Sequence, residues 1–112
     1  MRGEIITIGD ELISGRVCDQ NAHFLSGRLT SFGLEVTAIS SVGDDPDHIR
    51  DVLTRASARS EFVIVCGGLG PTEDDITTQV AADFFKRPLI LDQPYLDFLR
   101  HSVESRGLPW VE

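Results

Sequence analysis

Three glycines and three acidic residues separate an apolar segment from the start of an amphipathic one. The apolar run 62–66 is typical of a strand, and apolar residues from position 76 onward recur at helical spacing. A strand, a glycine turn and a helix N-terminus together form an anion site, because backbone N–H groups and the helix dipole attract negative charge. Acidic side chains would repel an anion bound at this site. The residues concerned are Gly67, Gly68, Gly70, Glu73, Asp74 and Asp75.

Acidic residues also follow two earlier strand-like segments, 4–8 and 34–42. Asp10 and Glu11 come after the first, and Asp44 and Asp45 come after the second. The carboxyl ends of parallel strands share one edge of a sheet, where the ligands of open α/β folds bind. Magnesium binds through one or two carboxylates together with phosphate oxygens. The sequence therefore predicts Mg²⁺ or another divalent cation between these acidic residues and a phosphate.

Helix capping is a simpler interpretation of the same acidic residues. Asp45 can cap the helix that begins at Pro46, and Thr72, Asp74 or Asp75 can cap the third helix. Capping uses one carboxylate for each helix, whereas these loops supply pairs and a triplet, so we favour the cation. Other phosphate motifs are absent from the sequence. No lysine follows the glycines as in a P-loop, and the dinucleotide-binding motif lacks its third glycine.

Hydrophobic periodicity predicts strands that alternate with helices, and hence an α/β three-layer sandwich with a mainly parallel sheet. Asp19 is placed to cap the first helix and Gly33 to end it. Strand 61–66 is apolar throughout, so we expect it to be buried on both faces and to need neighbours beyond a three-stranded sheet. The expected strands are 4–8, 34–42 and 61–66, with a polar loop over 9–19, an extended piece over 87–91, and helices beginning near residues 20, 46, 76 and 93.

Composition narrows the class of protein. The chain has 112 residues, enough for a single domain, with a net charge of −8 and an isoelectric point near 4.7. A nucleic-acid surface needs clustered Lys and Arg, and an anionic membrane would repel this chain, so we expect neither partner. We find no signal peptide and no apolar run long enough to span a bilayer, which predicts a cytoplasmic protein. The two cysteines, Cys18 and Cys66, are expected to be reduced.

Four motifs in order resemble the N-terminal domain of CinA-like proteins (competence/damage-inducible protein A), in the MoaB/Mog group of molybdopterin-binding folds. They are Gly9–Gly15, Asp19 with Asn21, Val42–Asp45 and Gly67–Thr77. The resemblance implies a pocket at the strand ends and metal-dependent hydrolysis of ADP-ribose-type pyrophosphates. In the Mog branch the same pocket binds molybdopterin, and Leu69 favours the CinA-like branch. Relatives continue beyond residue 112, so we expect the end of the domain, and any amidohydrolase domain, to be missing.

The resemblance and the acidic loops together give individual residues expected roles. The metal ligands would be Asp10, Asp44 and Asp75. Asp75 would also be catalytic, with Asp74 or Glu73 accepting the proton of the attacking water. The residues expected to bind phosphate or the rest of the ligand are Gly67, Gly68, Gly70, Thr72, Thr77, Ser14 and Asn21.

Two other functions remain open at this stage. The first is a molybdopterin-binding module that holds a pterin in place of a nucleotide, without hydrolysis. The second is a non-catalytic remnant that folds by forming a homo-oligomer, because an exposed parallel strand edge invites pairing with another chain.

Overall fold

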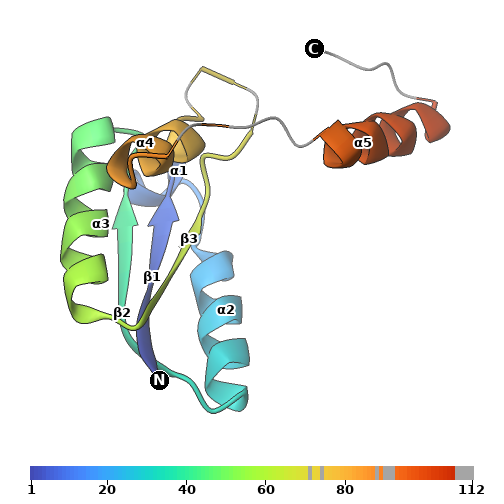
Figure 1. Cartoon of the computed structure of the whole chain (residues 1–112). Coiled ribbons are helices and arrows are strands. Elements are labelled where there is room, and N and C mark those ends of the chain that lie inside the picture. Colours follow the sequence, from blue (N-terminus) through green and yellow to red (C-terminus); the bar gives the residue numbers. More distant parts are fainter. Residues whose placement is uncertain (71, 74, 88, 90–92, 108–112) are drawn as a thin grey trace.

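The computed structural model describes residues 1–70, 72–73, 75–87, 89 and 93–107. Three parallel strands form one sheet in the order β2-β1-β3, so the first strand lies in the middle (Figure 1). The parallel sheet predicted from the sequence is confirmed. The elements are β1 (Arg2–Ile8), α1 (Asp10–Ile13), α2 (Gln20–Ser31), β2 (Glu35–Val42), α3 (Pro46–Arg59), β3 (Phe62–Cys66), α4 (Thr77–Phe84) and α5 (Gln93–Ser105).

Capping residues predicted from the sequence mark both ends of α2 and the start of α3. The Asp19 carboxylate accepts a hydrogen bond from the backbone N–H of Ala22 and so caps α2. The chain leaves α2 through Gly33, which has a φ of 85°. Asp45 caps α3 in the same way, and Pro46 occupies its first turn. These predictions are confirmed.

The sheet separates two helical layers, as the sequence predicts. Ile6 and Ile8 of β1 pack with Ile49, Val52 and Leu53 of α3 in the main hydrophobic cluster. Thr7, between the two isoleucines, faces the other side, where it donates a hydrogen bond to Asp19 at the start of α2. Figure 1 shows α2 and α3 on opposite sides of the sheet. The carboxyl ends of β1 and β3 are therefore held between two packed layers.

Strand β3 is only partly buried along its whole length, and our prediction that it is buried on both faces is wrong. It pairs with β1 on one side, and no other strand within the described residues pairs with its second edge. Burial of an apolar strand depends on neighbours that its own sequence does not specify. The central position, buried on both faces, belongs to β1.

Two further segments differ from the expectation. The polar loop predicted over 9–19 contains the short helix α1, whose four residues have no apolar periodicity that could reveal it. Helix α5 lies apart from the sheet in Figure 1 and has no buried residue. Its predicted cap, Asp92, and most of the predicted extended piece 87–91 lie outside the described residues.

None of the helices in the described part of the chain is long and apolar enough to cross a bilayer.

Candidate functional site

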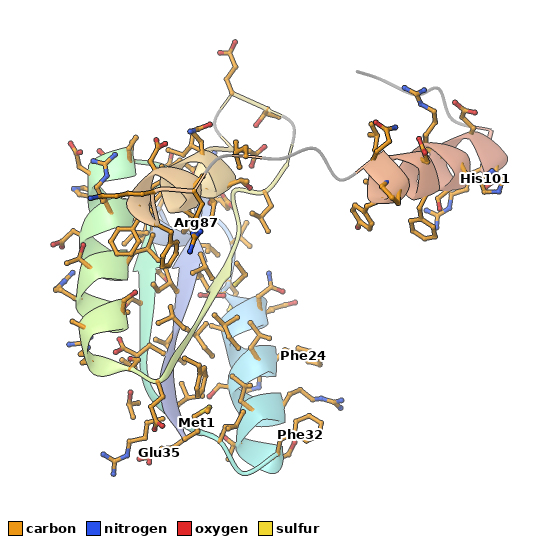
Figure 2. The ribbon with its side chains drawn as sticks, viewed as in Figure 1. Met1, Phe24, Phe32, Glu35, Arg87 and His101 are labelled. Carbon is orange, nitrogen blue, oxygen red and sulfur yellow. The ribbon has the colours of Figure 1, made fainter. Side chains whose placement is uncertain are left out.

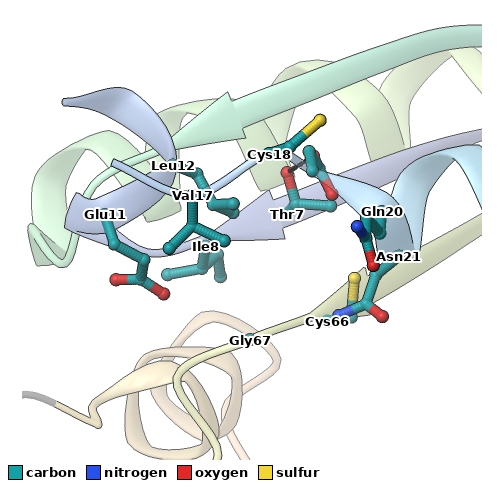
Figure 3. A pocket seen from close by; sticks show the side chains of 11 residues that line it. Thr7, Ile8, Glu11, Leu12, Val17, Cys18, Gln20, Asn21, Cys66 and Gly67 are labelled. Carbon is teal, nitrogen blue, oxygen red and sulfur yellow. Dashed lines mark hydrogen bonds between the residues drawn. The ribbon is translucent and has the colours of Figure 1, made fainter. Parts of the chain in front are cut away.

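A cavity of about 340 Å³ lies at the carboxyl ends of β1 and β3 (Figure 3). The strand ends, α1, the segment that follows it and the first turn of α2 all contribute to its wall. This is the edge of the sheet at which the sequence predicts a ligand. The lining residues are Thr7, Ile8, Glu11, Leu12, Val17, Cys18, Asp19, Gln20, Asn21, Cys66 and Gly67.

Asp19 is the most heavily hydrogen-bonded carboxylate of this cavity. Thr7 donates its hydroxyl to Asp19 Oδ2 at 2.7 Å, and Ser41 donates to the same oxygen at 3.2 Å. The Thr7 and Ser41 hydroxyls also contact each other at 2.6 Å. Burial raises the pKa of Asp19, but hydrogen bonds from Thr7, the Ala22 N–H and Ser41 together bring it below its usual value. The side chain is therefore a stable anion that joins β1, β2 and α2.

Cys66 faces this anion from the end of β3. Burial, and then the charge of Asp19, raise the pKa of the Cys66 thiol. Its sulfur lies 3.7 Å from the backbone oxygen of Ile6 as a weak donor. A raised pKa disfavours the nucleophilic thiolate, and the Cys66 side chain forms part of the cavity wall. Cys66 and the exposed Cys18 are both free, as predicted.

The first two glycines of the turn are needed by the fold itself. Gly67 has a φ of 95°, and a Cβ atom there would lie 2.1 Å from the backbone oxygen of Ile8. Gly68 has a φ of 65°, and its Cβ would lie 2.2 Å from the Thr77 hydroxyl. That hydroxyl donates to the backbone oxygen of Gly67 at 2.7 Å. Thr77 is thus buried as a brace of the turn, and its predicted role toward a ligand stays a prediction.

Asp75 closes the far end of the same turn. Its Oδ2 accepts hydrogen bonds from both the hydroxyl and the backbone N–H of Thr72. These two bonds lower the pKa of Asp75 below its usual value. Helix α4 starts after Ile76 without a side-chain cap, so the interpretation of Thr72 or Asp75 as its cap is wrong. The carboxylate turns back toward Thr72 and does not reach the helix.

The other predicted metal ligands form a pair. The Asp10 carboxylate accepts the backbone N–H of Asp44 at 2.9 Å, and the Asp44 carboxylate accepts the N–H of Asp10 at 3.2 Å. Over the described residues, no group of three or more His, Cys, Asp or Glu side chains could hold a metal. The structure therefore brings Asp10 and Asp44 together without adding Asp75. Each carboxylate bonds to the backbone of the other residue, so the two strand-end loops are joined at this point.

The remaining predicted residues divide between the cavity and the exposed surface. Asn21 lines the cavity at the start of α2, as Gly67 does at the end of β3. Ser14 is exposed at the end of α1, where its hydroxyl accepts a hydrogen bond from Arg16. Gly70 and Glu73 are exposed in the turn, and neither lines the cavity. Asp74 lies outside the described residues.

Sequence reasoning missed part of the cavity wall. Thr7 was treated as a strand residue, Asp19 as a helix cap and part of a family motif, and Glu11 as one of several acidic loop residues within another motif. A polar residue inside an isoleucine-rich run such as Glu4–Ile8 is a signal that could have indicated Thr7. Its partner Ser41 could not have been found in this way, because the pairing depends on the register between β1 and β2.

The family described as probable molybdopterin binding domain matches residues 4–106, which include nearly the whole sheet and the whole cavity wall. The chain belongs to this family. It is 41% identical to a CinA-like protein of Dictyoglomus thermophilum and 43% identical to a putative competence-damage inducible protein of Alkaliphilus metalliredigens. Each comparison covers all 112 residues of this chain and 27% of the relative, so the chain spans about a quarter of those proteins' length.

Solved structures of the same family share the fold. The protein CinA of unknown function from Thermoplasma acidophilum superimposes with a TM-score of 0.84 and 32% identity, over 98% of this chain and 63% of that one. The molybdopterin biosynthesis enzyme MoaB from Thermus thermophilus gives a TM-score of 0.70 and 26% identity, over 73% of this chain and 53% of that one. The MoaB/Mog fold and the resemblance to CinA-like proteins are thereby confirmed.

Proposed function

We propose that the strand-end cavity binds a nucleotide pyrophosphate of the ADP-ribose type with a divalent cation, and that the domain hydrolyses the pyrophosphate bond. The observation that carries this proposal is the charge of the cavity wall. Glu11 and Asp19 contribute carboxylates, and no Lys, Arg or His stands among the described residues that line it. A phosphate ligand would then need a cation to bind beside these carboxylates.

The uncharged part of the wall suits the rest of such a ligand. Ile8, Leu12 and Val17 offer an apolar surface for a planar base, whereas the amides of Gln20 and Asn21 can donate to and accept from ribose hydroxyls. The volume of about 340 Å³ lies near the lower end of the range for small-molecule sites. A nucleoside with its first phosphate would occupy this space.

The carboxylates at this edge of the sheet would divide the chemistry between them, with Glu11 on the cavity wall and Asp10 and Asp44 in the loops outside it. Asp10 and Asp44 would hold the cation, which offsets the phosphate charge and lowers the pKa of a bound water. Glu11 is placed on the wall to accept the proton as the water oxygen attacks phosphorus and the bridging P–O bond breaks. The products of ADP-ribose would be AMP and ribose 5-phosphate. Asp75 is a weaker candidate for the base, because its hydrogen bonds to Thr72 lower its pKa.

A binding module for molybdopterin, without hydrolysis, is the second candidate. The family description and the fold shared with MoaB support it. A pterin ring would use the same apolar wall, and its phosphate would take the place of the nucleotide phosphate.

Phosphorus NMR on ADP-ribose in MgCl₂ tests the hydrolase directly. We expect wild-type chain to release AMP, and Glu11→Gln to slow release by about 100-fold or more if Glu11 is the base. Glu104→Gln, on the exposed surface of α5, is the matched control and should leave the rate unchanged. Equal rates for wild type and Asp75→Asn would remove Asp75 from the mechanism. Molybdopterin binding without ADP-ribose turnover would reject the hydrolase and favour the second candidate.

A further inference from the structure

The carboxylate of Asp19 has one hydrogen-bonding position left for a ligand. An ionised carboxylate accepts about four hydrogen bonds, two at each oxygen. Oδ2 accepts from the hydroxyls of Thr7 and Ser41 at 2.7 and 3.2 Å, and Oδ1 accepts from the Ala22 N–H at 3.1 Å. One position on Oδ1 therefore remains, and Asp19 is part of the cavity wall.

The two hydroxyls beside Asp19 have no proton to donate to a ligand. Thr7 and Ser41 contact each other at 2.6 Å, and both contact Asp19 Oδ2. Each hydroxyl carries a single proton, and these contacts within the group use both protons. The lone pairs that remain, on Asp19 and on the hydroxyl oxygens, are all acceptors. This end of the cavity therefore suits a ligand group that donates a hydrogen bond.

A ribose hydroxyl fits this end of the cavity better than a phosphate does. A phosphate oxygen is an acceptor, and its negative charge would be repelled by Asp19. A ribose hydroxyl is a neutral donor, and hydrogen bonds to a charged acceptor are about twice as strong as those between neutral groups. Figure 3 shows Thr7, Gln20 and Asn21 at this end and Glu11 at the other. The proposed attack on phosphorus, beside Glu11, is thus separate from the end at Asp19.

We propose that Asp19 accepts a hydrogen bond from a ribose hydroxyl of the nucleotide, and that this bond makes the cavity selective for ribonucleotides. Hydrogen bonds from Thr7 and Ser41 hold the carboxylate for this role. The amides of Gln20 and Asn21 both donate and accept, so they bind a hydroxyl without requiring one. This inference rests on the proposed function, and it names the group of the ligand that determines specificity.

Titration calorimetry in Mg²⁺ compares ADP-ribose with its 2′-deoxy and 3′-deoxy analogues, each altered on the adenosine ribose. We expect wild type to bind at least one analogue at least tenfold more weakly than ADP-ribose, because the missing hydroxyl leaves Asp19 without its ligand bond. Asp19→Asn removes the charge and should reduce this ratio of dissociation constants at least threefold. Asparagine caps helices as well as aspartate does, so the variant should fold, which circular dichroism checks.

Two variants that also remove one carboxylate serve as matched controls. Asp45→Asn changes the cap of α3, and Asp45 lies outside the cavity wall. Glu35→Gln changes an exposed residue at the opposite end of the sheet (Figure 2). Both variants should keep the wild-type ratio, because a general change in stability or net charge alters the affinity for all three ligands alike.

The inference is overturned if wild type binds ADP-ribose and both analogues within twofold of one another. It is also overturned if folded Asp19→Asn keeps the wild-type ratio or binds none of the three ligands, or if a control lowers the ratio as much. Each of these results leaves the proposed function standing, because ADP-ribose still binds to wild type. No binding of ADP-ribose to wild type would overturn the proposed function together with this inference.

Discussion

Two carboxylates with lowered pKa values, Glu4 and Asp19, lie at opposite ends of β1 and are held in different ways. Glu4 is 2% exposed and receives two hydrogen bonds from the Arg59 guanidinium, at 2.7 and 2.9 Å, and one from Ser60 at 2.6 Å. Asp19 receives its hydrogen bonds from two hydroxyls and one backbone N–H. The first carboxylate is neutralised by a cation, whereas the described partners of the second are all neutral.

This difference separates a structural end of the sheet from a ligand-binding end. The hydrogen bonds from Arg59 are the main cause of the lowered pKa of Glu4, against a raising effect of burial. At Asp19 burial has the largest effect, and neutral donors overcome it. The negative charge therefore persists at the end that contains the cavity. Neutral donors hold this carboxylate as an anion whose charge no described cation offsets, which is the reason we place function at that end.

The largest expected effect tests the backbone contact at the ligand-binding end. Gly67→Ala should lower the free energy of unfolding by about 2–5 kcal/mol, because the residue has positive φ and its Cβ would collide with Ile8. Gly15→Ala is the matched control, with a φ of 79° and nothing within 4 Å of the added atom. It should cost only about 1–2 kcal/mol in urea unfolding. Equal losses of unfolding free energy in the two variants would mean that the collision with Ile8 adds nothing to the cost of a positive φ.

Removing the cation at the structural end should have the next largest effect. Arg59→Met leaves Glu4 buried with Ser60 as its remaining donor, so Tm should fall by about 5–10 °C in calorimetry. Adding Glu4→Gln should restore part of the loss, because a neutral amide is less costly to bury than a carboxylate. ADP-ribose binding should not change in either variant. If Arg59→Met melts at the same temperature as Arg59→Met with Glu4→Gln, the unpaired Glu4 charge is not the cause of the loss.

At the ligand-binding end, Thr7→Val should have a smaller effect on stability. The variant keeps the shape of the side chain but removes hydrogen bonds to Asp19 and Ser41, with an expected loss of about 1–2 kcal/mol. Ligand affinity should fall as well, because Thr7 and Asp19 both line the cavity. Unchanged affinity in titration calorimetry would show that the hydrogen-bonded group around Asp19 serves the fold alone.

The smallest effect is a difference in acid sensitivity. Folding lowers the pKa values of Glu4 and Asp19, so each carboxylate stabilises the fold above its unfolded value near 4, and this stability is lost as pH falls through the folded values. Tm should therefore be nearly constant from pH 7 to 5 and decline below about pH 4. Thr7→Val should lose less stability than wild type over the same acid range, as followed by circular dichroism, because the folded pKa of Asp19 then lies closer to its unfolded value. Identical profiles would argue against the hydroxyl as a cause of the lowered pKa of Asp19.

Local signals in the sequence predicted the elements well, and non-local contacts account for what was missed. The Asp45 cap, the Pro46 start and the apolar face of α3 are all local patterns, and the structure confirms them. The exposure of β3 depends on which strand becomes its neighbour, and α1 is too short to show periodicity.

The candidate site shows the same limit. The acidic loops were predicted to share one edge of the sheet, and Asp10 indeed meets Asp44 across 34 positions of sequence. The separate pairing of Asp75 with Thr72, and that of Thr7 with Ser41, depend on turn geometry and strand register. Thr72 and Asp75 have the spacing of a capping box, but no pattern of residue types specifies the pairing of Thr7 with Ser41.

The central claim is that the strand-end cavity binds a nucleotide pyrophosphate through a divalent cation. Titration calorimetry of the chain with ADP-ribose, in Mg²⁺ and again in EDTA, tests it most directly. We expect binding in Mg²⁺ that weakens at least tenfold in EDTA, and similar weakening in Asp10→Asn with Mg²⁺ present. Equal affinity with and without the cation, or no binding in Mg²⁺, would contradict the claim.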